Sequence, residues 1–471
     1  MKIELIGGCN KEELETRIQK VAAAGKLSRF KGNVFEVLES CNNYEKNLNL
    51  IKRIISMGHE SIIEHDYLVF AICDVTPIVE QTIIGSRLTS FTIKSRREVD
   101  FRTAGFYVPE FRTKDLKPHP KNEEIKEKYI KHMKYLFNTY GNLVDEGINV
   151  EDSRFILPYS FHSNIIMGLN ARELKKMVLS FLHGPLSKIS ELNKLGNEFY
   201  NIIKKYIPYL EEQISAYTPK VEEPFEYLES LSCRPNVKIL DKPHLISYTA
   251  NSDDVILKSS IMYHFQCSES EATEIMCNLE KKDKDFKAKY MNIILHKEEN
   301  RELEQVNFTF QIPISLSILT HLTRHRMHSL LVPEFLPLWN FENYIVPATI
   351  KAKPELEKMF IEAHDRNIEV LEEFKSLNIS DTDLIYFYLG CQMLNVVTSM
   401  NGRTLQWILH LRCCNKAQWQ IRGIAKEIAK QVKEVSPLLG KGLGATCVTD
   451  LICNEKRESC GLIDTLLKTN S

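Results

Sequence analysis

Two segments of the chain alternate apolar and polar residues and are rich in β-branched and aromatic side chains. They run from Asp66 to Val75 (DYLVFAICDV) and from Val306 to Ile314 (VNFTFQIPI). Alternation with a period of two places apolar side chains on one face of a sheet. Both segments are therefore predicted to be strands.

Three longer segments repeat apolar residues every three to four positions and carry charge between them. They span residues 122–147, 354–376 and 416–435. This spacing predicts amphipathic helices. Together with the strands it indicates an α+β fold that is rich in helices, with a central β-sheet in each domain.

An internal repeat organises the chain. The segment from Ile62 resembles the segment from Glu302, FYVPEF at Phe106 resembles NYIVPA at Asn343, and NARELKKMVLSFL at Asn170 resembles NGRTLQWILHLR at Asn401. The order is the same and the separation nearly constant, which indicates a tandem duplication. We place the boundary near residue 235, within SLSCRPNVKILDKP, so that the predicted domains are 1–235 and 236–471.

Composition narrows the classes of function. Of 471 residues, 43% are hydrophobic and 26% charged, as in soluble globular proteins, and no stretch is apolar enough to predict a membrane span. The 61 Lys and Arg balance the 62 Asp and Glu, so no binding of nucleic acid is expected. The N-terminal segment lacks the pattern of an export signal. The 12 cysteines are scattered, and we expect reduced thiols and a cytoplasmic location.

Two groups of residues raise the question of a metal. Cys447, Cys453 and Cys460 lie near the C-terminus, but their spacings are wider than those of common zinc knuckles. His321, His325 and His328 are predicted to share one helix face, without a carboxylate nearby in sequence. No metal is expected at either group.

Two basic motifs suit phosphate or carboxylate groups, because guanidinium forks match both. One is Arg324-His325-Arg326 followed by Ser329. The other combines Ser90, Ser95 and Arg97, which we expect on one loop. Taken alone, the first is better explained as a solvated helix face or a protein contact, and the second as an ordinary polar loop.

Two further motifs are less specific on their own. His59 and His65 begin and end the segment HESIIEH. They are six residues apart, whereas the two histidines of the zinc-protease motif must be four apart. Arg412 ends an apolar helical segment, where it would also neutralise the helix dipole.

Together these residues resemble the flavin-dependent thymidylate synthase (ThyX) family. That family carries Arg-His-Arg-x-x-Ser-x-x-x-x-Ser-x-Arg after a His-x-x-x-x-Glu-His segment, and later an Arg before Leu-Pro, an Asn-x-Arg on a helix, an Arg nine residues beyond it, and Ala-Gln-Trp-x-Ile-Arg. The matching residues here are His59 to His65, Arg154 before Phe-Ile-Leu-Pro, Asn170 and Arg172, Asn401 and Arg403, Arg412, and Ala417 to Arg422. The Cys-rich tail also looks like the family's ending.

The two repeats depart from this pattern in complementary ways. The first has Gly85-Ser86-Arg87 for Arg-His-Arg but keeps Ser90, Ser95 and Arg97. The second keeps Arg324 to Arg326 but has Glu334 and Leu336 for the later Ser and Arg. Arg154 is matched by Ile385, Arg412 by Phe181, and His59 by Glu299. We infer that the first repeat kept the half that holds the nucleotide and the second the half that binds flavin and activates the base.

The resemblance implies a reaction and roles for these residues. The family methylates dUMP at C5 with methylenetetrahydrofolate, FAD and NADPH, in sites between the subunits of a homotetramer. It implies that Arg412 is catalytic and also contacts the substrate. Substrate binding is implied for His321, Ser90, Ser95, Arg97 and Arg154. Contact with FAD is implied for His59, Ser61, Arg324, His325, Arg326, Asn170, Arg172, Asn401 and Arg403. A homodimer of this chain would rebuild a pseudo-tetramer.

Several further positions depart from the family. A family Glu is Ile93 or Val332, a flavin-contacting Asn is Lys176 or Trp407, and a Gln is His321. Two alternatives to a thymidylate synthase therefore stay open. One is a relative that modifies C5 of another pyrimidine nucleotide, for example by hydroxymethylation, and the other is a protein that binds nucleotide or flavin without turnover.

Overall fold

The computed structural model describes residues 1–219, 227–228, 230–231, 238–335 and 341–470. The boundary expected near residue 235 and the departure at Leu336 lie outside the described residues. The chain divides into two compact units. Unit 1 comprises Met1–Val237, Phe335–Glu342 and Val346–Cys391, and unit 2 comprises Lys238–Glu334, Asn343–Ile345 and Gln392–Ser471. Unit 1 therefore contains segments from both repeats.

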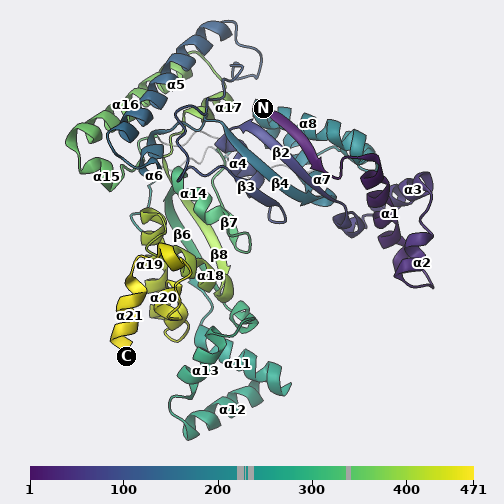
Figure 1. Ribbon diagram of the computed structural model, residues 1–471, viewed down its shortest axis with the longest axis vertical. Coiled ribbons are helices and arrows are strands. Elements are labelled where there is room, and N and C mark those ends of the chain that lie inside the picture. The colour runs from purple at the N-terminus through teal and green to yellow at the C-terminus, as the bar shows by residue number, and fades with distance from the viewer. Residues whose placement is uncertain (220–226, 229, 232–237, 336–340, 471) are drawn as a thin grey trace. The chain divides into compact units, whose positions relative to one another are not determined.

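Each unit contains one four-stranded antiparallel sheet, and both sheets have the same strand order. The order is β1-β2-β4-β3 in unit 1 and β5-β6-β8-β7 in unit 2 (Figure 1). The central strands β2 (Tyr67–Val75) and β6 (Asn307–Ser315) confirm the two predicted strands, each starting one residue later than expected. This common topology confirms the α+β class and agrees with a duplicated domain.

The elements of unit 1 come mostly from the first repeat. Its strands are β1 (Lys2–Gly7), β2, β3 (Ser90–Ile93) and β4 (Ser163–Asn170). Its helices are α1 (Lys11–Leu27), α2 (Val34–Glu39), α3 (Tyr44–Ser56), η1 (Glu60–His65), α4 (Pro77–Ile84), α5 (Asn122–Asp145), α6 (Val150–Ser153), η2 (Arg154–Ile156), α7 (Ala171–His183), η3 (Pro185–Lys188), α8 (Ser190–Tyr206), α9 (Glu211–Ser215), α15 (Ala348–Lys351), α16 (Pro354–Ser376), α17 (Asp381–Leu384) and η5 (Ile385–Phe387).

The elements of unit 2 come from the second repeat. Its strands are β5 (His244–Tyr248), β6, β7 (Ser329–Leu331) and β8 (Met393–Asn401). Its helices are α11 (Ser252–Phe265), α12 (Glu269–Lys282), α13 (Phe286–Leu295), η4 (Arg301–Gln305), α14 (Leu316–Thr323), α18 (Gly402–Arg412), α19 (Trp419–Val435), η6 (Leu439–Gly442), α20 (Thr446–Thr449), η7 (Lys456–Glu458) and α21 (Leu462–Asn470). Among the described residues, no helix has both the length and the apolar character needed to cross a bilayer.

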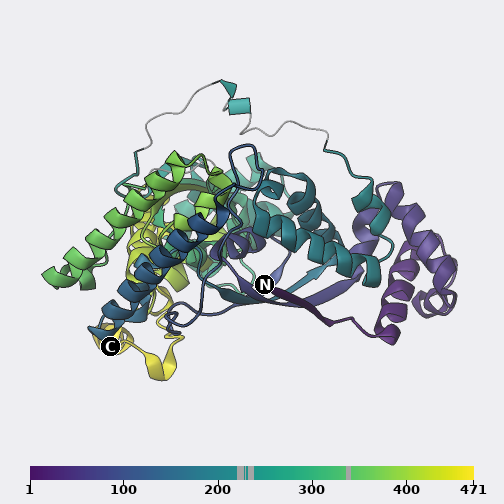
Figure 2. The same ribbon diagram turned by 90° about the horizontal axis from the view of Figure 1, so that it is seen from above.

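The long helices α5 and α16, predicted from their periodicity, lie side by side within unit 1 (Figures 1 and 2). A hydrogen bond joins the two helices in their buried interior: His132 Nε2 of α5 lies 2.9 Å from Asn367 Oδ1 of α16. Tyr129 of α5 also packs edge to face against Phe387, with ring centroids 5.5 Å apart. Because α16 and Phe387 belong to the second repeat, the two repeats share one hydrophobic core here.

Candidate functional site

The Arg-His-Arg motif follows a helix that is buried on every side. All eight residues of α14 are buried, including His321. Arg324 is the C-cap of this helix, where a cation is favourable because the backbone carbonyls there carry partial negative charge. The sequence alternates two exposed arginines with a buried histidine: Arg324 and Arg326 are exposed, and His325 is buried.

Arg412, the last residue of α18, meets this motif within unit 2. Its Nε donates a hydrogen bond of 2.9 Å to Nε2 of His325. Since Nε2 accepts, the neutral imidazole carries its proton on Nδ1. Burial lowers the pKa of His325 to about 3, and the charge of Arg412 acts in the same direction. The structure therefore brings together the two features expected to act on the flavin and on the uracil ring.

The low pKa of His325 predicts a dependence of stability on pH. A free histidine takes up a proton below about pH 6.5, so protonation favours the unfolded chain between pH 6.5 and pH 3. His325 is expected to remove about 2 kcal/mol of stability when the pH falls from 7 to 5. Urea unfolding at both pH values measures this loss, and His325→Gln should show a smaller one by that amount. An unchanged difference between the two pH values in the variant would contradict a neutral His325.

The residues expected to hold other parts of the flavin have structural partners as well. In both repeats the Asn caps a helix: Asn170 Oδ1 accepts from Glu173 N at 3.0 Å, and Asn401 Oδ1 accepts from Thr404 N at 2.8 Å. This pattern is typical of helix N-caps. The side chains of these two residues therefore fix the start of α7 and of α18.

The arginines that follow these caps make matched ion pairs. Arg172 binds Glu64 in unit 1, and Arg403 binds Glu304 in unit 2, with 2.8 Å between Nη1 and Oε1 in the second pair. Glu64 and Glu304 occupy equivalent places in the repeated sequence. The duplication has thus kept an ion pair between the 3₁₀ segment and the helix. His59 and Ser61 are exposed at the start of the 3₁₀ segment of unit 1.

Two of the arginines expected to hold the nucleotide, Arg97 and Arg154, lie near Glu151 in unit 1. Arg97 and Glu151 form an ion pair between half-buried side chains. Arg154 is almost fully buried at the start of η2, and burial lowers its pKa to about 9. The charges of Arg96 and Arg97 act in the same direction, and the charge of Glu151 opposes them. Two guanidinium groups and one carboxylate thus lie within electrostatic range, an arrangement suited to an anion.

Arg96 is a member of this group that the sequence analysis did not identify. Its Nη2 lies 2.7 Å from Oε2 of the fully buried Glu80 in α4. This buried ion pair joins the segment that follows β3 to helix α4. The adjacent pair Arg96-Arg97 was the only signal in the sequence, and it does not tell which side chain turns inward.

The serines of this motif were expected on one loop, and the structure corrects that expectation. Ser90 is exposed and begins strand β3, where it pairs with Gly168 of β4. Ser95 lies beyond the strand, and its Oγ accepts from Arg97 N at 3.3 Å. Because β3 pairs with β4 only over Ser90–Ile93, Ser90 belongs to the sheet and Ser95 to the segment that follows it.

The positions that lost their polar residue have entered the hydrophobic core. Phe181, which stands where the second repeat has Arg412, is 1% exposed, and Ile385, which stands where the first repeat has Arg154, is fully buried. Arg87, which in the first repeat matches the last residue of the Arg-His-Arg motif, is exposed. At Phe181 and Ile385 an apolar side chain that packs in the core thus stands where the other repeat has a guanidinium group.

The three histidines considered for a metal were expected on one helix face, and the structure corrects that expectation. Helix α14 ends at Thr323, so His325 and His328 do not share a helix face with His321. The chain turns there to form β7, and His328 Nδ1 lies 2.7 Å from Thr398 Oγ1 of β8. In the described part of the chain, no group of three or more His, Cys, Asp or Glu side chains is arranged to hold a metal ion.

Comparison with known proteins gives the same picture of a repeat. The family model of the thymidylate synthase complementing protein matches residues 12–209 and again residues 244–438. A flavin-dependent thymidylate synthase from Clostridium tetani is 28% identical over 239 residues, which cover 47% of this chain and 93% of that protein. The two matched segments fall on either side of the expected repeat boundary.

Other relatives match over shorter lengths. The flavin-dependent thymidylate synthase of Thermococcus onnurineus is 34% identical over 136 residues, covering 28% of this chain and 53% of that protein. That of Geobacter sulfurreducens is 31% identical over 154 residues, covering 33% and 64%. The chain thus spans between half and two thirds of these two relatives. Among solved structures, the UMP/dUMP methylase PolB from Streptomyces cacaoi superposes with a TM-score of 0.38 at 21% identity, covering 46% of this chain and 95% of that one.

Proposed function

The chain belongs to the thymidylate synthase complementing protein family, and on that premise we propose that it is a flavin-dependent thymidylate synthase that methylates dUMP at C5. The relatives from Clostridium tetani, Thermococcus onnurineus and Geobacter sulfurreducens bear that name. The observation that carries the proposal is the hydrogen bond between Arg412 and His325 in unit 2. It joins the late arginine to the Arg-His-Arg motif.

Arg412 is proposed as the catalytic residue. Methylation at C5 requires the uracil ring to react as a nucleophile, which places negative charge on the ring. A guanidinium held in place beforehand stabilises such charge without reorganisation. His325 supports this role because its neutral imidazole accepts a hydrogen bond from Nε of Arg412. It therefore orients the guanidinium without neutralising the positive charge that would act on the uracil ring. In this proposal Arg412 also contacts the substrate.

Arg97 and Arg154 are proposed to hold the phosphate of the nucleotide. A phosphate carries about two negative charges and three acceptor oxygens, so it competes effectively with one carboxylate for guanidinium groups. Glu151 pairs with Arg97 in the structure. When the phosphate binds, the ion pair between Arg97 and Glu151 breaks and Arg97 pairs with the phosphate instead. Ser90 and Ser95 supply hydroxyl donors nearby in the sequence, and His321 is proposed to act on the nucleotide from α14.

The donor set of unit 2 fits an anionic cofactor. Arg324 and Arg326 are exposed on either side of the buried His325, and planar cations of this kind bind pyrophosphate and stack on ring systems. FAD would supply the redox chemistry, methylenetetrahydrofolate the carbon atom and NADPH the reducing equivalents. The residues proposed to hold FAD are Arg324, His325, Arg326, Asn401, Arg403, His59, Ser61, Asn170 and Arg172.

The two repeats are proposed to serve one site rather than two. The phosphate-holding arginines are kept only in the first repeat, and Arg412 and the Arg-His-Arg motif only in the second. The positions vacated at Phe181 and Ile385 are buried in apolar surroundings, so neither can be a polar binding residue. One competent set of groups therefore exists per chain. We propose a homodimer as the assembly.

Complementation of a thymidine auxotroph tests the function. The wild-type gene is expected to restore growth without thymidine, and the gene carrying Arg412→Ala is not. Release of tritium from C5-tritiated dUMP by the purified, flavin-containing protein would show the same chemistry in solution. Growth failure with tritium release would indicate another modification at C5. Failure of both, with flavin or nucleotide bound, would indicate a binding protein and overturn the proposal.

A further inference from the structure

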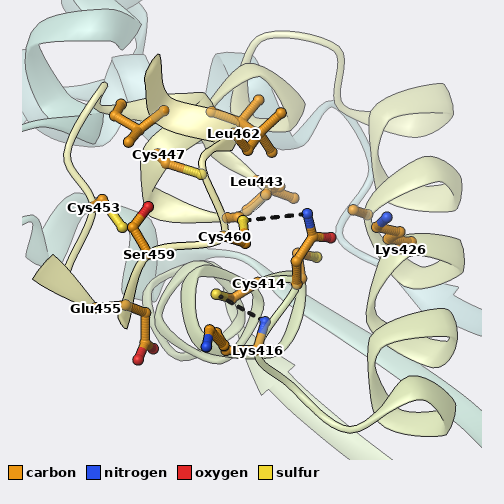
Figure 3. Close-up of a pocket in the computed structure, with 17 residues that line it drawn as sticks. Cys414, Lys416, Lys426, Leu443, Cys447, Cys453, Glu455, Ser459, Cys460 and Leu462 are labelled. Carbon is orange, nitrogen blue, oxygen red and sulfur yellow. Dashed lines mark hydrogen bonds between the residues drawn. The ribbon is translucent and has the colours of Figure 1, made fainter. Parts of the chain in front are cut away.

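Five cysteines line one pocket at the C-terminal end of unit 2 (Figure 3). They are the buried Cys413 together with Cys414, Cys447, Cys453 and Cys460. Cys414 lies just beyond α18, Cys447 belongs to α20, and Cys460 directly precedes the turn into α21. Chain segments separated by about 30 residues thus direct thiols into the same space. The proposed function uses none of them.

Cys460 has the surroundings of a reactive thiol. Its side chain is exposed. Asn415 Nδ2 donates to its Sγ over 3.5 Å, a contact drawn as a dashed line in Figure 3. The backbone N–H of Leu462, and then the Asn415 amide, lower the pKa of the Cys460 thiol below its usual range. Because the thiolate is the nucleophilic form, these donors favour attack by Cys460.

Cys447 has the surroundings of the second partner. It is half-buried, and burial raises the pKa of its thiol, with smaller effects from Cys414, Cys453 and Cys460. Cys414, Cys453 and Cys460 line the same pocket as Cys447. A protonated thiol beside an exposed, more acidic one is the arrangement found at redox-sensitive cysteine pairs.

The helices around these thiols contribute little to the hydrophobic core. None of the described residues of α20, η7 or α21 is buried. Val448 and Ile452 are more than half exposed. Such a segment gains from a covalent link, because a cross-link restricts the chain where packing does not. In the described residues no three of these side chains are arranged as a metal site.

We propose that Cys460 and Cys447 form a reversible disulfide when a hydroperoxide reaches this pocket. The Cys460 thiolate attacks the peroxide, its sulfur gains an OH group to become a sulfenic acid, and one water or alcohol leaves after protonation. The Cys447 thiol then attacks that sulfur, an S–S bond forms, and water leaves. Two thiols lose two electrons in total and the peroxide gains them. A small-molecule dithiol reverses the reaction.

This modification site is independent of the proposed function. The test below reads the bond directly and needs no turnover, so the failure of one proposal does not affect the other.

The full-length protein, reduced and then treated with a slight excess of hydrogen peroxide, tests the proposal. We expect the number of titratable thiols to fall by two. Trypsin cuts after Lys441, Lys456, Arg457 and Lys468, so the product should link the peptide of residues 442–456 to that of residues 458–468. Because Cys453 shares the first peptide with Cys447, the digest is repeated on Cys453→Ser, which should still form the link. Reduction should restore both thiols.

Matched variants make the result specific. Cys460→Ser and Cys447→Ser should each abolish the link, whereas Cys277→Ser, which removes an exposed thiol on α12, should not. Circular dichroism confirms that each variant folds. Equal oxidation rates of Cys460 and Cys277 would overturn the proposal. So would about one zinc ion per chain that protects the thiols until a chelator removes it, because the pocket would then be a metal site.

Discussion

Replacing Arg412 with alanine is expected to lower the turnover number by about 100- to 1000-fold and to change the KM for dUMP far less. Removing a preorganised donor that acts on charge developing in the transition state costs about that much in other enzymes. Arg412 has such preorganisation, since its Nε is held by the buried His325. Tritium release from C5-tritiated dUMP, with folate and reductant at saturating concentrations, measures the effect.

Replacing Arg97 with alanine is expected to act on binding instead. Charge-assisted hydrogen bonds contribute about 1.5–3 kcal/mol each, so the KM for dUMP should rise by about 10- to 100-fold. Arg87→Ala is the matched control, because it removes an exposed guanidinium from the same repeat. Because Arg97→Ala removes the ion-pair partner of Glu151, circular dichroism is used to check that the variant still folds. Equal losses in all three variants would contradict a single competent set of residues.

A mixture of the two variants shows how the halves are assembled. If Arg97→Ala and Arg412→Ala chains restore activity when refolded together, the residues of one site come from two chains. If neither mixing nor refolding restores it, either one chain supplies both halves or the subunits fail to exchange. Either result is compatible with the proposed roles of the residues, which the single variants test.

Periodicity was sufficient to predict the main elements, because it reflects burial on one face. The strands around Phe70 and Phe310 and the long helices α5 and α16 lie where the alternation placed them, to within a residue or two. Helix α19 starts at Trp419 rather than at residue 416 because the Gln418 side chain caps its first backbone N–H groups. Caps of this kind depend on local geometry that apolar spacing does not encode.

Interactions between distant segments could not be predicted in the same way. The residues after Thr323 suit a helix, yet pairing of β7 with β8 ends α14 and separates His325 from His321. The sequence likewise showed two repeats but not that α15–α17 of the second repeat pack in unit 1. Of the proposed site, Arg97, Arg154 and Arg412 follow from the sequence motifs, whereas the contact between Arg96 and the buried Glu80 joins segments whose pairing no motif indicates.

Replacing Asp383 with alanine is expected to lower the free energy of unfolding by about 3–5 kcal/mol. Asp383 is 1% exposed and receives the backbone N–H of Arg112 at 2.8 Å, together with the Arg112 Nη2 at 2.6 Å. Removing the carboxylate leaves a largely buried guanidinium without its counter-charge, which is the costly way to break such a pair. Urea titration followed by circular dichroism measures the change.

The location of this pair predicts where the damage spreads. Arg112 belongs to the first repeat and Asp383 to the second, and Arg112 Nη2 also donates to the Lys188 carbonyl and to Thr382 Oγ1. Hydrogen exchange should therefore speed up in α5 and α16 together, since both repeats contribute to this core. Removing both partners should cost less than the sum of the two single substitutions, because no unpaired charge remains. Glu373→Ala, which breaks an exposed pair between the same two helices, should change little. Faster exchange confined to α16 would show that the repeats fold separately and that the shared core contributes no coupling.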